Sequence, residues 1–229
     1  MRYLGGKTRI AKQLAAVIDQ HRRPGQLAWD AFCGGLSMSV ALSKNGPVCS
    51  TDANAALINL YLSVQRGWIA PDDVTEEIYQ SARALPDTDP MKAFCGFGMS
   101  FGGKWFGGRA KLTPGKFAPG VSRRSLERTT RGLEIRHMDF MLEAPGPVDA
   151  ILYLDPPYSG TQAYPGMPAF DSDLFWERAR AWAQFTTVFV SEYTSDWPEV
   201  WSRDVTCNLS GGTGAKRTER LFMLSKGVA

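Results

Sequence analysis

Short apolar runs alternate with amphipathic stretches along almost the whole chain, and this alternation restricts the fold more than any other feature. The clearest run is VDAILYLD (148–155), which is apolar almost throughout, as expected for a strand at the centre of a parallel sheet. Apolar residues in 8–23 recur at helical spacing, and Pro24-Gly25 ends that pattern. Strands that alternate with helices form parallel sheets. The sequence therefore predicts an α/β fold with a doubly wound, mostly parallel sheet.

The other elements follow from the same periodicities. We expect helices over 8–23, 37–45, 53–67, 71–85, 122–134 and 172–185, and strands over 27–32, 47–52, 135–140, 148–155 and 186–193. Two further apolar runs (204–210 and 219–225) flank the loop GGTGAKRT and predict a C-terminal antiparallel hairpin. No internal repeat or low-complexity linker divides the chain, so residues 1–229 are expected to form a single domain.

Composition excludes several classes of protein. Of the 229 residues, 44% are hydrophobic and 21% are charged, which is ordinary for a globular protein and excludes a wholly disordered chain. No apolar run approaches the roughly 18 residues that span a bilayer, and MRYLGGKTR lacks a signal-peptide core, so a cytoplasmic location is expected. Four cysteines without a CxxC pair and two histidines predict no metal site, no disulfide framework and no triad-type hydrolase.

Positive charge is concentrated in one fifth of the chain. Residues 92–136 contain ten basic and two acidic side chains, a balance of +8, although the net charge of the protein is only +3. Within this part, 90–122 reads as an irregular insert rich in glycine and aromatic residues, and loops of that length are usually functional. Flexible backbone, flat side chains and positive charge together suit a nucleic acid. The alternative is a solvated loop with a few aromatic side chains in the core.

A second pattern predicts a nucleotide-sized pocket. Asp30-Ala-Phe-Cys-Gly34-Gly35 lies where a strand passes into a helix, and glycines there let a ligand approach the backbone. Asp52 ends the next strand, where doubly wound folds place an acid that binds ribose hydroxyls. The alternatives are a simple tight turn and an Asp52 that caps the following helix. The spacing does not distinguish NAD from S-adenosylmethionine.

The residues expected to carry the chemistry are Asp155, Pro156, Pro157 and Tyr158, directly after the most apolar strand. Ligands of open α/β sheets bind at the carboxyl ends of strands. Proline has no backbone donor, so the Asp155 carboxylate and the Pro156 carbonyl would accept two hydrogen bonds from a planar exocyclic amine. Tyr158 would stack on the ring that carries the amine. The alternative is an ordinary strand-ending turn.

Four motifs in this order, YLGGK (3–7), DAFCGG (30–35), TDANAALINLY (51–61) and DPPY (155–158), resemble the Dam-like DNA adenine-N6 methyltransferases. SEY (191–193) and RTERLF (217–222) extend the resemblance over nearly the whole chain. The resemblance implies a Rossmann-like methyltransferase sheet, S-adenosylmethionine as cofactor, and transfer of a methyl group to the N6 amine of an adenine in double-stranded DNA. One departure is that the family more often has a further glycine at the position of Leu36.

The resemblance also implies site residues. The cofactor-binding set comprises Tyr3, Lys7, Asp30, Phe32, Gly34, Gly35, Asp52 and Asp155, in which Tyr3 and Lys7 belong to the segment that binds the methionine part and Asp52 matches the acid that holds the ribose. Asp155 matches the aspartate that lies against both cofactor and target amine. The residues expected to contact DNA are Lys104, Trp105, Arg109, Lys111, Lys116, Arg123, Arg124, Arg128, Lys216 and Arg217, with Arg131 on the helical face of Arg124 and Arg128.

The implied mechanism takes the adenine out of the duplex, because its N6 atom cannot be reached inside the stack. A monomer in a bacterial or virus-infected cell, with or without a separately encoded restriction endonuclease, is consistent with this activity. Three other functions stay open: an RNA methyltransferase acting on an exocyclic base amine, a non-catalytic nucleic-acid-binding module, and an NAD-linked oxidoreductase. The basic segment argues against the oxidoreductase, and YLGGK argues against the RNA enzyme.

Overall fold

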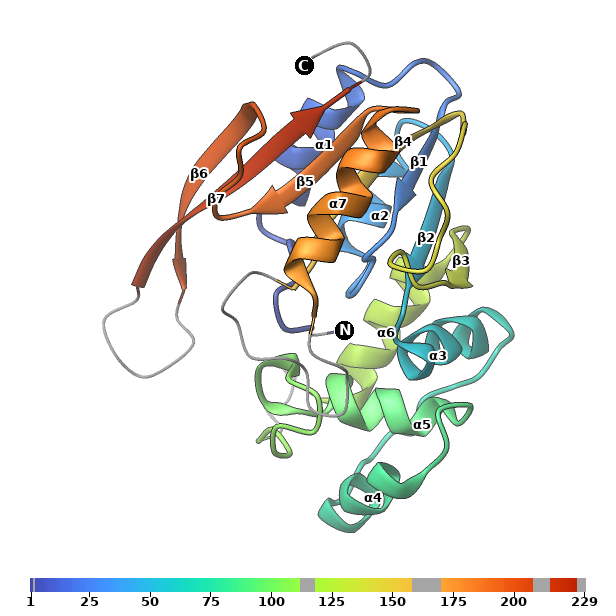
Figure 1. Ribbon diagram of the computed structural model, residues 1–229. Coiled ribbons are helices and arrows are strands. Elements are labelled where there is room, and N and C mark those ends of the chain that lie inside the picture. The colour runs from blue at the N-terminus through green and yellow to red at the C-terminus, as the bar shows by residue number, and fades with distance from the viewer. Residues whose placement is uncertain (2, 112–117, 158–169, 208–214, 226–229) are drawn as a thin grey trace.

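The computed structural model describes residues 1, 3–111, 118–157, 170–207 and 215–225. In this part of the chain, seven strands form one sheet in the order β3-β2-β1-β4-β5-β7-β6. The strands are β1 (Leu27–Asp30), β2 (Val48–Asp52), β3 (Glu134–His137), β4 (Ala150–Leu154), β5 (Val188–Glu192), β6 (Glu199–Cys207) and β7 (Ala215–Leu224). The first five are parallel, and β7 pairs antiparallel with both β5 and β6. The predicted doubly wound sheet with a C-terminal antiparallel hairpin is therefore confirmed (Figure 1).

Helices cover both faces of the sheet, as Figure 1 shows. The α-helices are α1 (Ala11–Asp19), α2 (Ser37–Leu42), α3 (Ala55–Gln65), α4 (Glu76–Ser81), α5 (Pro90–Ala93), α6 (Pro119–Thr130) and α7 (Ser172–Ala183). Alternate residues of β4 face opposite layers: Ile151 and Tyr153 pack with α1 and α2, whereas Leu152 and Leu154 pack with α7. This double burial explains why the β4 segment is apolar almost throughout.

A third apolar cluster lies outside the two sheet layers. It joins α3, α4, α5 and α6 into a helical unit, seen below the sheet in Figure 1. Asn54 caps α3 by accepting a hydrogen bond from Leu57 N at 2.9 Å, which fixes where the chain leaves the sheet. The unit begins directly after β2 and ends directly before β3. The chain thus enters the helical unit from the carboxyl end of β2, and Figure 1 shows the unit beside that edge of the sheet.

The 90–122 segment is more regular at its ends than the sequence indicated. Pro90–Ala93 form α5, Phe94–Gly98 form a π-helical turn, and α6 already begins at Pro119. Phe94 and Phe97 are fully buried, and Trp105 and Phe106 pack against the same cluster, so these four aromatic residues belong to the core of the helical unit. Phe101 is 67% exposed. Burial of aromatic surface thus anchors a segment whose glycines had indicated an irregular loop.

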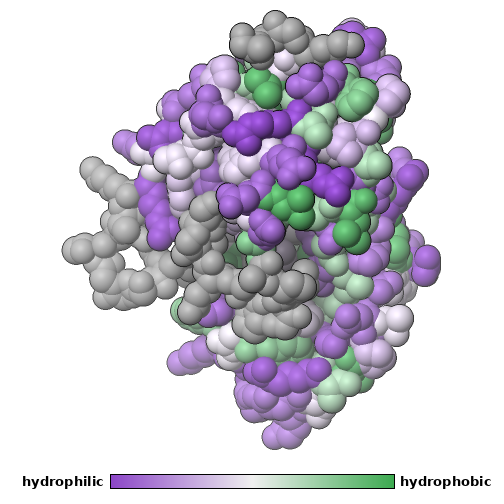
Figure 2. All heavy atoms as spheres, viewed as in Figure 1, coloured by the Kyte–Doolittle hydropathy of each residue, from purple (hydrophilic) through white to green (hydrophobic). Residues whose placement is uncertain are grey.

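Element boundaries differ from the prediction by a few residues. Residues 71–85 contain only the short α4 and a following 3-10 turn (Ala82–Ala84), and β6 begins at Glu199, five residues earlier than expected. Within the described residues, no helix is both long and apolar enough to cross a membrane. In Figure 2, the apolar residues on the face shown form small separate clusters among hydrophilic ones.

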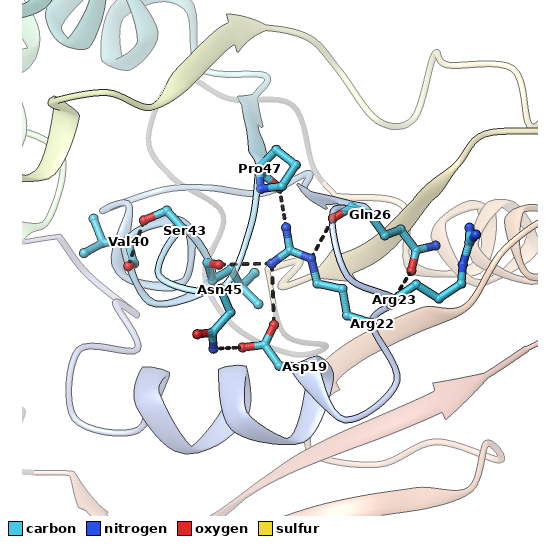
Figure 3. Close-up of polar contacts among 9 residues, drawn as sticks. Asp19, Arg22, Arg23, Gln26, Val40, Ser43, Asn45 and Pro47 are labelled. Atoms are coloured by element: carbon cyan, nitrogen blue, oxygen red, sulfur yellow. Dashed lines mark hydrogen bonds and ion pairs between the residues drawn. The ribbon is translucent and has the colours of Figure 1, made fainter.

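Arg22 secures the amino ends of β1 and β2 (Figure 3). Its guanidinium donates hydrogen bonds to the carbonyl oxygens of Gln26 at 2.8 Å and Leu42 at 3.0 Å, and to that of Pro47. It also lies 3.5 Å from an Asp19 carboxylate oxygen, and its side chain is only 2% exposed. One planar cation therefore joins the end of α1, the end of α2 and the start of β2.

Candidate active site

Three carboxylates gather at the carboxyl ends of adjacent strands. Asp30 is the last residue of β1, Asp52 is the last residue of β2, and Asp155 directly follows β4. Because β1 lies between β2 and β4 in the sheet, the three strand ends are neighbours. Electrostatic coupling among the three groups agrees with this placement, since Asp155 and Asp52 both raise the pKa of Asp30. The sheet thus concentrates acid where doubly wound folds bind ligands.

Lys7 places a buried positive charge against Asp155. Its Nζ atom lies 2.8 Å from Asp155 Oδ1 and 3.6 Å from Glu219 Oε2, and the lysine side chain is 8% exposed. Burial acts to lower the pKa of Lys7, but the charges of Asp155 and Glu219 and the hydrogen bond that Lys7 donates to Asp155 outweigh it, so this pKa is raised. Lys7 is therefore a stable cation inside the acidic cluster.

Asp30 is the most deeply buried member of the cluster. Its Oδ2 atom accepts a 2.6 Å hydrogen bond from Ser39 Oγ, whereas Oδ1 has no hydrogen-bond partner among the described residues. Burial is the largest cause that raises the pKa of Asp30 to about 7; the Ser39 hydrogen bond opposes it and the charges of Asp155 and Asp52 add to it. Buried oxygens without a partner are rare in native proteins, so a donor from a bound molecule is expected at Oδ1.

Asp52 links the glycine turn to the start of α3. Its Oδ2 accepts from Gly34 N at 3.0 Å, and its Oδ1 accepts from Asn54 N at 2.9 Å. Burial raises its pKa, although both backbone hydrogen bonds act in the opposite direction. The residue that caps α3 is Asn54, so the simple capping role for Asp52 is wrong. Each carboxylate oxygen can accept more than one hydrogen bond, which leaves capacity for ligand hydroxyls.

The Gly34-Gly35 turn is closely covered by Tyr3. A Cβ atom on Gly34 would lie 2.8 Å from the Tyr3 ring, and one on Gly35 would lie 3.0 Å from Tyr3 Cβ, so neither position accepts a larger residue without movement. Tyr61 Oη donates to the Gly34 carbonyl at 2.6 Å and fixes the turn from the other side. The absence of side chains at Gly34 and Gly35 thus allows Tyr3, from the N-terminal segment, to pack directly against the backbone of the turn.

Leu36 adopts a left-handed backbone conformation, with a φ of 61°. This is the position at which the resembled family more often has glycine, and glycine adopts such angles without steric cost. The Leu36 side chain is completely buried in the cluster shared with the helical unit. Burial of the leucine offsets the backbone strain, which is on the order of 1–3 kcal/mol for such residues.

The remaining predicted residues of the acidic site follow the ends of β4 and β1 along the chain. Pro156 is buried and Pro157 is half-buried, whereas Tyr158 lies outside the described residues. Phe32 packs edge-on against Phe175 and also contacts Phe140, with ring centroids 5.8 and 5.6 Å apart. It therefore belongs to an aromatic cluster beside the end of β1.

Three residues near the site, Glu219, His137 and Asp139, were not identified as site residues from the sequence. Glu219 of β7 reaches Lys7, and the isolated RTERLF run gave no sign of an ion pair with the N-terminal segment. His137 ends β3 and Asp139 lies two residues further along the chain. Both influence the pKa of Asp52: His137 lowers it and Asp139 raises it. Because HMD lies near the carboxyl end of the strand predicted over 135–140, its position could have indicated His137 and Asp139.

Some of the predicted DNA-contacting residues bind other groups of the protein through their side chains. Arg109 donates to the Val74 carbonyl at 3.0 and 2.7 Å, and Arg123 pairs with Asp72 at 2.7 Å, so both stabilise the helical unit. Trp105 is half-buried, with its ring centroid 4.6 Å from that of Phe97. Arg217 donates to Tyr193 Oη at 2.8 Å and lies over its ring.

The other members of the set are exposed or fall outside the described residues. Lys104, Lys111, Arg124 and Arg128 are exposed, as is Arg131. Lys116 lies outside the described residues, and the side chain of Lys216 in β7 does as well. Arg124, Arg128 and Arg131 line a shallow depression of about 350 Å³ together with Glu127. Arg124 and Arg128 lie on one side of α6, as predicted, whereas Arg131 directly follows the last residue of this helix.

The acidic cluster is chemically compatible with S-adenosylmethionine. The unpartnered Asp30 Oδ1 suits the ammonium group of an amino acid, because buried carboxylates require a cationic or hydrogen-bonding partner. Asp52 retains acceptor capacity for ribose hydroxyls. The chain therefore holds residues suited to both polar ends of such a molecule.

Comparison with solved structures gives distant similarities. A proposed RNA methyltransferase from Pyrococcus horikoshii aligns over 97% of this chain and 87% of its own, at 9% identity and a TM-score of 0.48. A precorrin-6Y C5,15-methyltransferase from Geobacter metallireducens aligns over 99% and 94%, at 10% identity and a TM-score of 0.42. The rRNA methyltransferase AviRa from Streptomyces viridochromogenes aligns over 93% and 84%, at 16% identity and a TM-score of 0.35.

At these values the structural likeness says nothing about the substrate. None of the curated proteins matches the sequence of this chain. A family model does match its N-terminal part, which contains Tyr3, Lys7, Asp30 and Asp52. Residues 3–94 of this chain match the D12 class N6 adenine-specific DNA methyltransferase family, and this match confirms the resemblance that the motifs indicated.

Proposed function

We propose that this protein is an S-adenosylmethionine-dependent methyltransferase that modifies the N6 amine of adenine in double-stranded DNA. The observation that carries the proposal is the buried Lys7–Asp155 ion pair at the carboxyl end of β4. Asp155 heads the DPPY motif, and Lys7 lies within the segment that matches the N6-adenine methyltransferase family. The pair joins the two motifs into one site, next to the carboxylates of Asp30 and Asp52.

The chemistry that this chain contributes is recognition and polarisation of an amine. The Asp155 carboxylate and the Pro156 carbonyl accept its two N–H groups, which favours a tetrahedral nitrogen with its lone pair available. When bound, S-adenosylmethionine supplies an electrophilic methyl group. Pre-oriented acceptors of this kind lower the barrier by position and electrostatics, without a covalent bond to the protein. Tyr158 is proposed as the stacking surface for the adenine ring, as the DPPY motif implies.

The cofactor-binding roles follow from the donor and acceptor groups. Asp30 is assigned to the ammonium group and Asp52 to the ribose hydroxyls. Tyr3, Phe32, Gly34 and Gly35 form the adjoining wall. Lys7 touches Asp155 directly, so its role extends from the methionine-binding segment to the proposed catalytic acid.

Duplex DNA is proposed to lie along the exposed basic residues. Lys104, Lys111, Arg124, Arg128 and Arg131 are exposed and suited to phosphate contacts. Arg109 and Arg123 are assigned a structural part in this interface, because they hold Val74 and Asp72. Phosphate contacts would offset the few kcal/mol that are needed to flip the target base out of the duplex.

The proposal is tested by following a tritiated methyl group from S-adenosylmethionine into nucleic acid. The substrates are DNA from cells that lack adenine methylation, RNA of mixed sequence, and a DNA in which purine without the 6-amine replaces adenine. We expect label in the first DNA alone, recovered as N6-methyladenine after digestion to nucleosides. Label in RNA alone would instead support the RNA methyltransferase, and cofactor binding without transfer to any substrate would support the non-catalytic module.

A further inference from the structure

Strand β7 brings a carboxylate into the site from the C-terminal hairpin. Glu219 pairs with Arg203 of β6 and directly precedes Arg220, which pairs with Glu192 at the end of β5. Its side chain is only 14% exposed. Its Oε2 atom is 3.6 Å from Lys7 Nζ, whereas Asp155 Oδ1 is 2.8 Å from the same nitrogen. The shorter contact is a charge-assisted hydrogen bond and the longer one is mainly Coulombic. Lys7 is therefore shared unequally between two carboxylates.

The charges around Asp155 come from several elements. Lys7 precedes α1, Glu219 lies on β7, Asp30 ends β1, Tyr153 lies on β4 and Tyr193 follows β5. All of them are electrostatically coupled to Asp155, or to Lys7 beside it. In this described set, Lys7 is the cation and three groups are carboxylates. A change in the interaction of Lys7 with either carboxylate therefore alters how strongly Asp155 can accept a hydrogen bond.

We infer that Glu219 is a positioning residue that acts on Asp155 through Lys7. This inference rests on the proposed function, because it gives Asp155 the amine-accepting role. Lys7 keeps Asp155 ionised, and Glu219 draws part of the Lys7 charge toward β7, so the ionised Asp155 stays a strong acceptor. Without Glu219, Lys7 interacts more strongly with Asp155, which lowers the pKa of Asp155 and weakens it as an acceptor. Without Lys7, the neighbouring carboxylates repel one another and Asp155 takes up a proton more readily.

The test uses two variants that move the charge in opposite directions, Glu219→Gln and Lys7→Met. Carbon-13 NMR of aspartate-labelled protein follows the titration of the Asp155 carboxyl, which is assigned with Asp155→Asn, while Asp30→Asn identifies the Asp30 signal. We expect the Asp155 titration to shift to lower pH in Glu219→Gln and to higher pH in Lys7→Met. The acidic limb of the kcat–pH profile should shift in the same directions, and kcat in Glu219→Gln should fall by about tenfold to a hundredfold.

Glu199→Gln is the matched control, because Glu199 pairs with Arg220 at 3.0 Å across the same β6–β7 hairpin but does not touch Lys7. It should leave both titration and kcat unchanged. Glu219→Asp keeps the charge, so it should recover part of the rate that Glu219→Gln loses. The Asp155 titration should also lie closer to that of the wild type than it does in Glu219→Gln. Thermal unfolding of each variant separates loss of fold from loss of positioning.

The NMR titration decides the inference even if the wild-type protein methylates no nucleic acid, an outcome that would remove the proposed function by itself. The inference is overturned if Glu219→Gln leaves the Asp155 titration where it is in the wild type. It is equally overturned if both variants shift that titration in the same direction, or if Glu199→Gln shifts it as much as Glu219→Gln does.

Discussion

A buried cation lies at each end of the sheet, Arg22 at the amino end and Lys7 at the carboxyl end, but their partners differ in kind. At the amino end, the Arg22 guanidinium binds the backbone carbonyls of Gln26, Leu42 and Pro47, with one carboxylate at 3.5 Å. At the carboxyl end, Lys7 binds the carboxylates of Asp155 and Glu219. The same charge is thus surrounded by neutral, fixed acceptors at one end and by ionisable acceptors at the other.

This difference separates stability from chemistry. Backbone carbonyls cannot titrate, so the three hydrogen bonds from Arg22 to carbonyl oxygens do not change with pH, and they hold three chain segments together. Carboxylates can gain a proton, and a cluster of them in a buried place shifts their pKa values toward the working range, as for Asp30. Replacing a carboxylate that binds Lys7 should therefore affect activity more than stability. Replacing Arg22 should affect stability more than activity.

The largest expected effect is at the carboxyl end. Asp155→Asn should lower methyl transfer by about a thousandfold, because it removes a charged acceptor aimed at the reacting amine. The fold should survive, since Lys7 keeps Glu219 as a partner. Transfer of tritiated methyl groups measures the first effect, and urea unfolding measures the second. A variant that keeps most of its activity would remove Asp155 from the mechanism.

Arg22→Met should show the opposite behaviour. It removes the side-chain donor of three backbone carbonyls, of which those of Leu42 and Pro47 keep only their backbone donors, and it leaves a hole in a buried place. We therefore expect a loss of about 3 kcal/mol in the free energy of unfolding. Arg23→Met is the matched control, because the Arg23–Asp149 pair is 69% exposed on each side and should contribute less than about 1 kcal/mol. Activity per folded molecule should be unchanged in both. Equal losses of stability in the two variants would contradict the comparison.

The third prediction concerns pH. A cationic ammonium group binds the ionised form of Asp30, whose pKa is raised to about 7, so affinity for S-adenosylmethionine should fall by up to about tenfold per pH unit below 7. Between its ordinary pKa of 3.8 and about 7, folded Asp30 holds a proton that the unfolded chain has lost. Asp30 therefore lowers the stability of the protein as the pH rises through this window.

Asp30→Asn should weaken the binding of S-adenosylmethionine and remove most of its pH dependence. Isothermal titration calorimetry between pH 5.5 and 8 measures both properties. A binding constant that still falls steeply below pH 7 in the variant would place the responsible group elsewhere.

The smallest expected effect is on a third set of cations, which neither hold the sheet nor face the acids. Replacing exposed Arg124 and Arg128 by glutamine should weaken duplex binding at every sequence and reduce the slope of log K against log salt by about two. Arg180→Gln is a control on another surface, where Arg180 pairs with Asp196 at 2.9 Å. Fluorescence anisotropy with labelled duplex at several salt concentrations measures the slope, and an unchanged slope would exclude this helix face.

The sequence predicted the strands, the helices that follow them, and the acids at the strand ends, because each depends on local periodicity. It located the 90–122 segment but not its role in packing. Glycine-rich backbone suggested a loop, whereas Phe94 packs against Trp68 and Phe97 packs against Tyr3, and both partners are distant in sequence. Arg109 and Arg123 were counted with the DNA-contacting residues because their charge is visible in the sequence and their partners are not.

The sequence by itself determined which groups end each strand of the parallel sheet, since alternation of apolar and polar residues and the turn residues are local properties. Only the tertiary structure decided which cations pair with carboxylates, as Lys7 does, and which bind backbone carbonyls, as Arg22 does. Lys7, Asp155 and Glu219 come from the N-terminal segment, the centre and the C-terminal hairpin of the chain. Their interaction energy depends on distance and burial in space, and neither quantity is encoded in any one stretch of residues.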